Sequence, residues 1–400
     1  MTSEKSKNEI CARFQFIIPF MIYLDYAATT PVDPRVLDAM LPYFRESFGN
    51  PSSVHRYGQK AEAALESARE TVASVLHCRA DEIIFTSCGS ESDNLALRGA
   101  ALASGKKRIL TSKTEHHAVS KTAEQLEKQY GFLIEWLNGN EYGEVMPASL
   151  SKALSKDTAL ASVMYANNEI GTINPIAELA ALAKANNVVF HTDAVQAAAY
   201  LDVNVEALGV DLMSLGAHKF YGPKGVGALY VRNGVKLVPH LTGGGQEFGL
   251  RAGTQNVPSI VGFAEALRLA ADEREQRVAH VKPLRDQIIG RVLEEIPASK
   301  LTGRPEKRLP NHASFVFKDA DGNFLLQLLD VAGFACSSGS ACKTGNPEPS
   351  EVVSALGLSR DWALGSLRIT LGVDSTVANV DSFLKALPVL VEKSRNLNHR

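Results

Sequence analysis

The chain has 400 residues, 45% of them hydrophobic and 22% charged, a composition typical of a soluble globular protein with one large and one smaller domain. Lysine and arginine number 42 against 44 aspartate and glutamate, and this balance argues against the basic stripe of a direct nucleic-acid binder. No run reaches the roughly 18 apolar residues that a membrane-spanning helix needs, and the five cysteines lack the spacing of a secreted disulfide framework, which favours a cytoplasmic location.

The N-terminal segment imitates a targeting signal. Residues 15–24, "QFIIPFMIYL", are apolar and follow a stretch that contains lysine and arginine. A signal peptide also needs small residues at a cleavage site, and "DYAATTP" fits the opening of a folded domain better. Because Met21 is a plausible alternative start, residues 1–20 are expected to be a disordered extension. Residues 21–32 are expected to join the small domain.

Short apolar runs alternate with longer amphipathic stretches along the first two thirds of the chain. The amphipathic stretches at 58–77 and 176–187 predict helices, and the apolar runs predict buried strands at 82–87, 108–113, 132–137, 159–166, 188–194 and 225–232. This alternation predicts an α/β fold with helices on both faces of a mostly parallel sheet. Ligands of such sheets bind beyond the carboxyl ends of the strands.

The pattern changes near residue 270. A long charged helical pattern covers 265–296, and shorter strands are predicted at 312–318 and 366–372. We therefore expect a large domain over 33–270 and a smaller α+β domain over 271–400. A loop rich in serine and glycine, about 335–351, carries Cys342, and such a composition is typical of an exposed, flexible arm.

Polar side chains follow several of the predicted strands. Asp193 and Gln196 follow the strand at 188–194, and His218 and Lys219 lie in a glycine-rich turn after "DLMSL". Each of them also has an ordinary interpretation: a lysine after a strand is usually solvated, and an aspartate there often caps a helix. His116, which follows the strand at 108–113, is as compatible with a surface histidine as with a functional one.

Taken together, these groups suit one cofactor. "TSCGSES" opens a helix whose free N–H groups at Gly89 and Ser90 favour a phosphate. Pyridoxal phosphate needs such a cradle, a lysine that binds it covalently and an acid that pairs with its ring nitrogen. Neither G-x-G-x-x-G nor G-x-x-x-x-G-K-[ST] occurs, so the dinucleotide and P-loop fingerprints do not apply.

At this point the sequence resembles a known family. Nine motifs match those of cysteine desulfurases in order and spacing: "YLDYAATTPVDPRV", "FGNPSSVHRYG", "FTSCGSESDNLA", "TEHHAV", "NNEIGT", "HTDAVQ", "AHKFYGPKGVGALYVR", "GGGQEFGLRAGTQN" and "SSGSAC". The match runs from about 22 to 372. It implies the pyridoxal-phosphate fold type I of aspartate aminotransferase, with a seven-stranded sheet. The "SSGSAC" loop is similar to the branch that serves iron–sulfur cluster assembly and tRNA thiolation.

The resemblance implies a role for each matching residue around the cofactor ring. Lys219 carries the cofactor covalently, Asp193 pairs with the ring nitrogen, and Gln196 bonds the phenolate oxygen. His116 stacks on the ring and is also our candidate for activating the Cys342 thiol.

The resemblance also implies residues that hold the substrate and the phosphate. Asn168 contacts ring and substrate, and Arg368 clamps the substrate carboxylate. Gly89, Ser90 and His218 hold the phosphate, with Thr254 reaching it from the partner of a homodimer.

Three positions depart from the family pattern. Gly216 stands where many relatives have a phosphate-binding serine, Ser90 replaces the commoner threonine, and Phe248 occupies a position often held by arginine. The first change is expected to weaken cofactor binding modestly, and none of the three removes a catalytic group.

The reaction implied is conversion of L-cysteine to L-alanine with transfer of sulfur to a Cys342 persulfide. Acceptor proteins, such as an iron–sulfur scaffold, then receive the sulfur. Cys336 is the rival nucleophile, and the sequence "GFACSSG" predicts that it is buried at the end of a strand. No C-x-x-C pair is present and no metal site is expected. The alternatives are a selenocysteine lyase or a small-amino-acid aminotransferase of the same fold, or a non-catalytic assembly scaffold.

Overall fold

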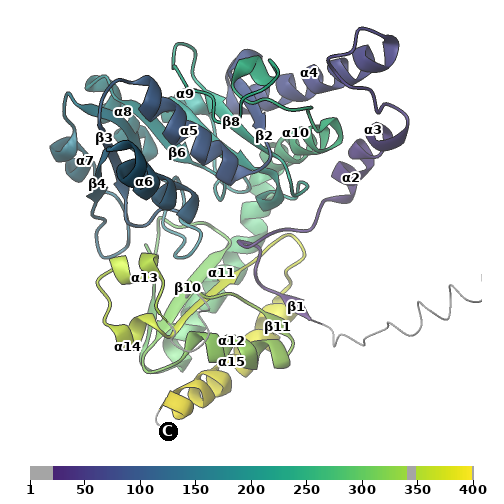
Figure 1. Ribbon diagram of the computed structural model, residues 1–400. Coiled ribbons are helices and arrows are strands. Elements are labelled where there is room, and N and C mark those ends of the chain that lie inside the picture. Colours follow the sequence, from purple (N-terminus) through teal and green to yellow (C-terminus); the bar gives the residue numbers. More distant parts are fainter. Residues whose placement is uncertain (1–20, 340–347, 399–400) are drawn as a thin grey trace, which may run out of the picture.

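The computed structural model describes residues 21–339 and 348–398, and its largest element is a seven-stranded sheet (Figure 1). The strands follow the order β2 (Ile83–Thr86), β8 (Gly227–Val231), β7 (Leu212–Gly216), β6 (Val189–Asp193), β5 (Thr158–Ser162), β3 (Arg108–Ser112) and β4 (Leu133–Leu137). Strand β8 runs in the direction opposite to the other six strands of this sheet. The predicted mostly parallel α/β fold is therefore confirmed.

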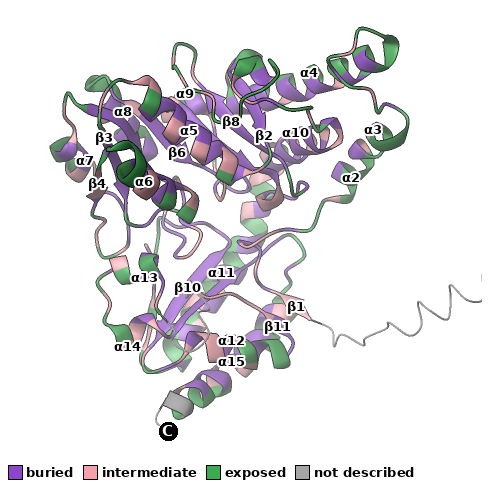
Figure 2. Cartoon of the chain, in the orientation of Figure 1, coloured by how far each residue is buried: buried purple, intermediate pink, exposed green. Residues whose placement is uncertain are grey.

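Side chains of this sheet enter two separate cores because successive residues of a strand point to opposite faces. Ile109, Leu160 and Leu212 pack in the core beneath α5 (Gly89–Ala103) and α6 (His117–Tyr130). Their chain neighbours Leu110 and Met213 pack in the core on the opposite face. Both faces are buried (Figure 2), which explains why these strands appear in the sequence as continuous apolar runs.

Helices α4 (Arg56–Leu76), α8 (Ile176–Ala185) and α10 (Val257–Asp272) contribute to that opposite core. Helix α10 packs against α4 and α2 (Pro34–Met40), which is followed by the short α3 (Pro42–Arg45). Shorter elements of this part are α7 (Pro147–Ala153), α9 (Val205–Leu208), η1 (Ala80–Glu82), η2 (Ala217–Lys219) and η3 (Glu247–Gly249).

The second part of the molecule is built on an antiparallel sheet in the order β12 (Ser366–Thr370), β10 (His312–Phe317) and β9 (Ser299–Leu301). Helices α11 (Arg274–Glu295), α12 (Gly322–Val331) and α15 (Val377–Asn398) pack around it (Figure 1). The short α13 (Glu351–Ala355) and α14 (Arg360–Ala363) precede β12. Near the start of the chain, β1 (Ile22–Tyr23) pairs in parallel with β11 (Phe334–Ala335), which attaches the N-terminal segment to this part.

The single long helix predicted over residues 265–296 is wrong. The continuous charged pattern over 265–296 is two helices, because α10 ends at Asp272 and α11 begins at Arg274. Glu273 between them has φ -99° and ψ 4°, and its carboxylate accepts hydrogen bonds from Arg277 and Arg35. The break lies near residue 270, where the sequence places the domain boundary, and that division stays a prediction.

The other predicted strands and helices form with ends shifted by a few residues. The carboxyl ends of β6 and β7 point toward the second part, so residues after these strands meet Arg368 of β12. Among the helices of the described residues, none is both long and apolar enough to cross a bilayer.

Candidate active site

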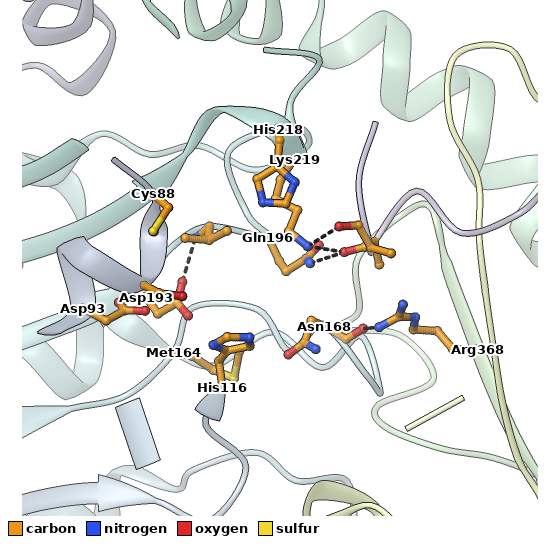
Figure 3. Close-up of a pocket in the computed structure, with 15 residues that line it drawn as sticks. Cys88, Asp93, His116, Met164, Asn168, Asp193, Gln196, His218, Lys219 and Arg368 are labelled. Carbon is orange, nitrogen blue, oxygen red and sulfur yellow. Dashed lines mark hydrogen bonds between the residues drawn. The ribbon is translucent and has the colours of Figure 1, made fainter. Parts of the chain in front are cut away.

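A cavity of about 330 Å³ lies where the carboxyl ends of the large sheet meet the second part of the molecule. Nine of the eleven residues that the sequence proposes line it: Gly89, Ser90, His116, Asn168, Asp193, Gln196, His218, Lys219 and Arg368 (Figure 3). Thr254 does not line this cavity and is exposed. Cys342 lies outside the described residues.

Lys219 ends the short helix η2 that follows β7, so its amine enters the cavity from the sheet edge. Its Nζ donates hydrogen bonds to the backbone oxygens of Ala27 (2.6 Å) and Ala28 (2.9 Å). Burial, followed by the Arg368 cation, lowers the pKa of Lys219 to about 8. A larger fraction of this amine than of an ordinary lysine is therefore uncharged, and hence nucleophilic, near neutral pH.

Asp193 is the last residue of β6 and is buried beneath the cavity. Its Oδ1 accepts a hydrogen bond from the backbone N–H of Val195 at 2.9 Å, so the side chain does cap the turn that follows. Burial raises the pKa of Asp193, while the nearby His116 and Lys219 oppose that rise. The ordinary capping role and a place in the cavity therefore coexist in this residue.

His116 is the N-cap of α6, and its Nδ1 accepts a hydrogen bond from the N–H of Ala118 at 3.1 Å. Desolvation is the main cause that lowers the pKa of His116, with the Lys219 cation adding to it. A neutral imidazole that accepts at Nδ1 carries its proton on Nε2.

The helix α5 presents its first N–H groups to the cavity. Its N-cap residue, Cys88, makes no side-chain cap, so the N–H groups at Gly89 and Ser90 remain available for an anion. His218 lies nearby with its Nδ1 3.2 Å from Thr29 Oγ1. Burial and the neighbouring lysines lower the pKa of His218 to about 4, which makes it a neutral hydrogen-bonding group.

At the opposite end, Arg368 is held by two partners. Its Nη2 donates to Asp25 Oδ1 at 2.7 Å, and its Nη1 donates to the backbone oxygen of Asn168 at 3.1 Å. Its Nε has no hydrogen-bond partner among the described residues. Gln196 Nε2 shares the backbone oxygen of Ala27 with Lys219, at 2.7 Å. The cavity thus has a fixed guanidinium at one end and a carboxylate at the other.

Several residues of the site were not singled out from the sequence. Asp25 holds Arg368 and also accepts a hydrogen bond from Ser337 at 2.7 Å, although the motif "YLDYAATTP" contains it. Asp93 and Met164 line the cavity as well, and Glu115 lies buried beside them. A position in the second turn of a helix after a strand is the signal that points to Asp93.

Cys336 was expected to be buried at the end of a strand; in the structure it follows β11 and is only partly buried, packed against the hydrophobic core. Burial and the Asp25 carboxylate raise the pKa of the Cys336 thiol far above its usual range. Because only the thiolate is a strong nucleophile, Cys336 is poorly suited to attack a substrate.

Comparisons with known proteins agree with this arrangement. The family described as "Aminotransferase class-V" matches residues 22–383. "Cysteine desulfurase IscS" of Dictyoglomus turgidum is 48% identical over 94% of this chain and 96% of its own length. "Cysteine desulfurase IscS" of Methanosarcina thermophila is 46% identical over 94% and 93%.

Solved structures are similar as well. A "NifS-like protein" superposes with a TM-score of 0.87 at 38% identity, covering 93% of this chain and 100% of its own. "SspA in complex with cysteine" has a TM-score of 0.76 at 35% identity, covering 88% and 98%. The chain therefore belongs to the class-V aminotransferase family and, within it, to the cysteine desulfurases, which depend on pyridoxal phosphate.

Proposed function

We propose that this protein removes the sulfur of L-cysteine, leaves L-alanine, and passes the sulfur to its own Cys342 as a persulfide. The observation that carries the proposal is the placement of a lysine amine with a lowered pKa, a buried carboxylate and an arginine in one cavity (Lys219, Asp193 and Arg368). Family membership supplies the reaction type.

The donor groups of the cavity fit pyridoxal phosphate. Lys219 would bind its aldehyde, Asp193 its ring nitrogen, and the N-terminus of α5 with Ser90 and His218 its phosphate. Gln196, Asn168 and His116 would surround the ring. When bound, the cofactor supplies an electron sink for the substrate amino acid.

The residues of this chain then have separate tasks. Arg368, fixed by Asp25 and Asn168, binds the substrate carboxylate and orients its Cα. Lys219 Nζ in its uncharged form takes the Cα proton, a role that its lowered pKa permits.

Transfer of sulfur is assigned to Cys342. Its thiolate forms a new S–S bond to the substrate sulfur as the Cβ–S bond breaks, and a proton that ends on Cβ completes alanine. The raised pKa of the partly buried Cys336 thiol supports this choice between the two thiols. His116 is proposed as the group that takes the thiol proton; its neutral imidazole can accept it at Nδ1 once that atom releases the N–H of Ala118.

The test is a reaction of the cofactor-loaded protein with L-cysteine and a reductant, in which alanine and sulfide are quantified. We expect equal amounts of both products. Cys342→Ser should keep the visible absorbance of the bound cofactor and lose sulfide, and the matched Cys336→Ser should keep both. Equal losses in the two variants would contradict the assignment of the nucleophile.

We also propose a homodimer in which Thr254 completes the phosphate site of the partner subunit. Thr254 is exposed and does not line the cavity of its own chain. An apolar surface on α2, α3 and the start of α4 supports such an interface, because Leu41, Phe44, Phe48 and Tyr57 are each more than half exposed, at 52%, 56%, 65% and 57%. Gel filtration with light scattering measures the expected dimer, and a monomer that still binds the cofactor tightly would contradict it.

The sulfur acceptors are proposed to be cytoplasmic proteins of iron–sulfur cluster assembly or tRNA thiolation, as the "SSGSAC" loop suggests. A persulfide exposed on the enzyme is a suitable donor to an acceptor thiolate, because a thiolate attacks a sulfur–sulfur bond directly.

A further inference from the structure

A second carboxyl group lies beside Asp193 under the cavity, and no motif assigns it a role. Asp93 is on the second turn of α5 and is 1% exposed. One oxygen of Asp93, one oxygen of Asp193 and one ring nitrogen of His116 all lie within 4.8 Å of one another. Figure 3 shows Asp93 and Asp193 side by side on the same wall of the cavity.

The His191 ring close to Asp93 does not provide a positive charge. Asp93 Oδ1 lies 3.6 Å from His191 Nε2 and has no hydrogen-bond partner among the described residues. The fully buried His191 is bonded at Nδ1 to Ser162 Oγ (2.8 Å) and at Nε2 to Ser214 Oγ (3.0 Å). Burial lowers the pKa of His191 to about 3, so the ring is neutral and the contact with Asp93 is not an ion pair.

Besides the rings of His191 and His116, the ionisable groups that face Asp93 are negative when ionised. They are Asp193 on β6, Glu115 before α6 and Cys88 at the start of α5. Burial raises the pKa of Asp93, the Asp193 carboxylate raises it further, and a hydrogen bond with Ser214 offsets only part of the rise. Two buried carboxyl groups that share one site cannot both ionise near neutral pH.

The surroundings of the two acids decide which one keeps the proton. Asp193 is stabilised as a carboxylate by the N–H of Val195 and by the positive charges that Lys219 and His116 can carry. Asp93 shares the neighbouring His116, but its closest ring is the neutral His191 and its other ionisable neighbours are acids. The electrostatic difference favours ionised Asp193 and protonated Asp93.

We propose that Asp93 is a positioning residue that stays protonated in the cofactor-loaded enzyme and so leaves the single negative charge of the pair on Asp193. This inference rests on the proposed cofactor site. A positively charged ring nitrogen then meets one carboxylate, and no second buried anion is left unpaired. The neutral Asp93 carboxyl keeps its hydrogen bond with Ser214 and supports the wall of the cavity.

The first test is Asp93→Asn, which replaces a neutral carboxyl with a neutral amide of the same shape. The dissociation constant of pyridoxal phosphate should stay within about threefold of the wild type, since no charge is lost. Loss of about tenfold or more in cofactor affinity would overturn the inference, because it would show that Asp93 acts as an anion.

The second test detects the proton itself, in the wild type. Infrared spectra of the cofactor-loaded wild type should show the carbonyl stretch of a protonated carboxyl that shifts when only aspartate is labelled with ¹³C. Glu115→Gln is the matched control, because burial raises the pKa of Glu115 to about 8, and its loss should leave the aspartate band in place. A loaded wild type without any aspartate band would overturn the inference.

Cofactor binding and the protonation of Asp93 can be tested separately. A wild type that takes up no pyridoxal phosphate contradicts the proposed function and this inference together. A wild type that binds the cofactor, beside an Asp93→Asn variant that binds it about tenfold more weakly or worse, contradicts only the role of Asp93.

Discussion

The two ends of the cavity hold charge by different means. At the end near the large sheet, Asp193, Asp93, Glu115 and His191 are all buried, and desolvation is the main influence on each pKa. At the other end, Arg368 is fixed by hydrogen bonds to Asp25 and to the backbone oxygen of Asn168. Burial at the first end sets the protonation states of its acids and of His191. Hydrogen bonds at the second end set the position of the Arg368 guanidinium.

The difference shows why residue type alone does not define a role. Asp25 is bonded at 2.7 Å to the permanent cation of Arg368, which lines the cavity. Asp193 lines the cavity itself and lies in a group of acids that compete for charge. A substitution at the sheet end should therefore change cofactor chemistry, and one at the arginine end should change substrate binding.

The largest effect is expected for Asp193→Asn, which removes the only carboxylate assigned to the cofactor ring. Breaking a buried charge pair costs about 3–5 kcal/mol, so cofactor affinity or kcat should fall about 100-fold or more. Asp211→Asn is the control, since Asp211 accepts a hydrogen bond from Phe190 N–H away from the cavity. Similar losses of cofactor affinity in both variants would show that Asp193 has no special role in binding the cofactor.

A smaller effect is expected at the arginine end for Arg368→Lys. Lysine cannot keep the separate hydrogen bonds to Asp25 and Asn168 and also offer a fork to a carboxylate. The KM for L-cysteine should rise about tenfold or more while cofactor absorbance stays unchanged. Arg304→Lys, at an ion pair with the buried Glu144 and outside the lining of the cavity, should leave the KM as it is. Cofactor loss in Arg368→Lys would contradict the prediction.

The pH dependence of cofactor capture links the two ends. Only the uncharged amine of Lys219 attacks the aldehyde, so the rate at which cofactor-free protein takes up pyridoxal phosphate should rise with pH and reach half of its maximum near pH 8. Arg368→Gln removes a cation that lowers the pKa of Lys219, which should move this curve to higher pH. The curve of Lys224→Gln, a variant at an exposed site, should not move. An unmoved curve in Arg368→Gln would show that Arg368 does not influence the pKa of Lys219.

The smallest effect is expected for Gly216→Ser, which restores the hydroxyl that many relatives have. Gly216 has φ -141° and ψ 117°, an extended conformation that serine adopts freely, and an added Cβ would lie 3.4 Å from Gly89 N. One added hydrogen bond contributes about 0.5–1.5 kcal/mol, so cofactor affinity should rise about twofold to tenfold. A fall in affinity measured by titration would contradict this placement of the phosphate.

Much of the fold was predictable because burial on both faces leaves a strong sequence pattern. Continuous apolar runs such as "EIIFTS" and "VVFHTDA" became β2 and β6, and Asp193, Lys219 and His116 follow strands or helix starts that meet at one sheet edge. That convergence follows from parallel topology, so it can be inferred before any distance is known.

The remainder depends on packing that local sequence does not encode. The separation of α10 from α11 at Glu273 depends partly on Arg35, a residue more than 200 positions earlier in the chain. The pairing of Asp25 with Arg368, and the approach of Asp93 on α5 to Asp193 on β6, also join distant segments. Such contacts appear only once the helices and strands are assembled.

The most direct test of the central claim is the mass of the Cys342 peptide after one turnover. The cofactor-loaded protein is mixed with an equal amount of L-cysteine, without reductant, and digested for mass spectrometry. We predict that the peptide carrying Cys342 gains the mass of one sulfur atom in step with the alanine formed, while the Cys336 side chain stays unmodified. Alanine formed without added sulfur on Cys342, or no alanine at all, would contradict the account.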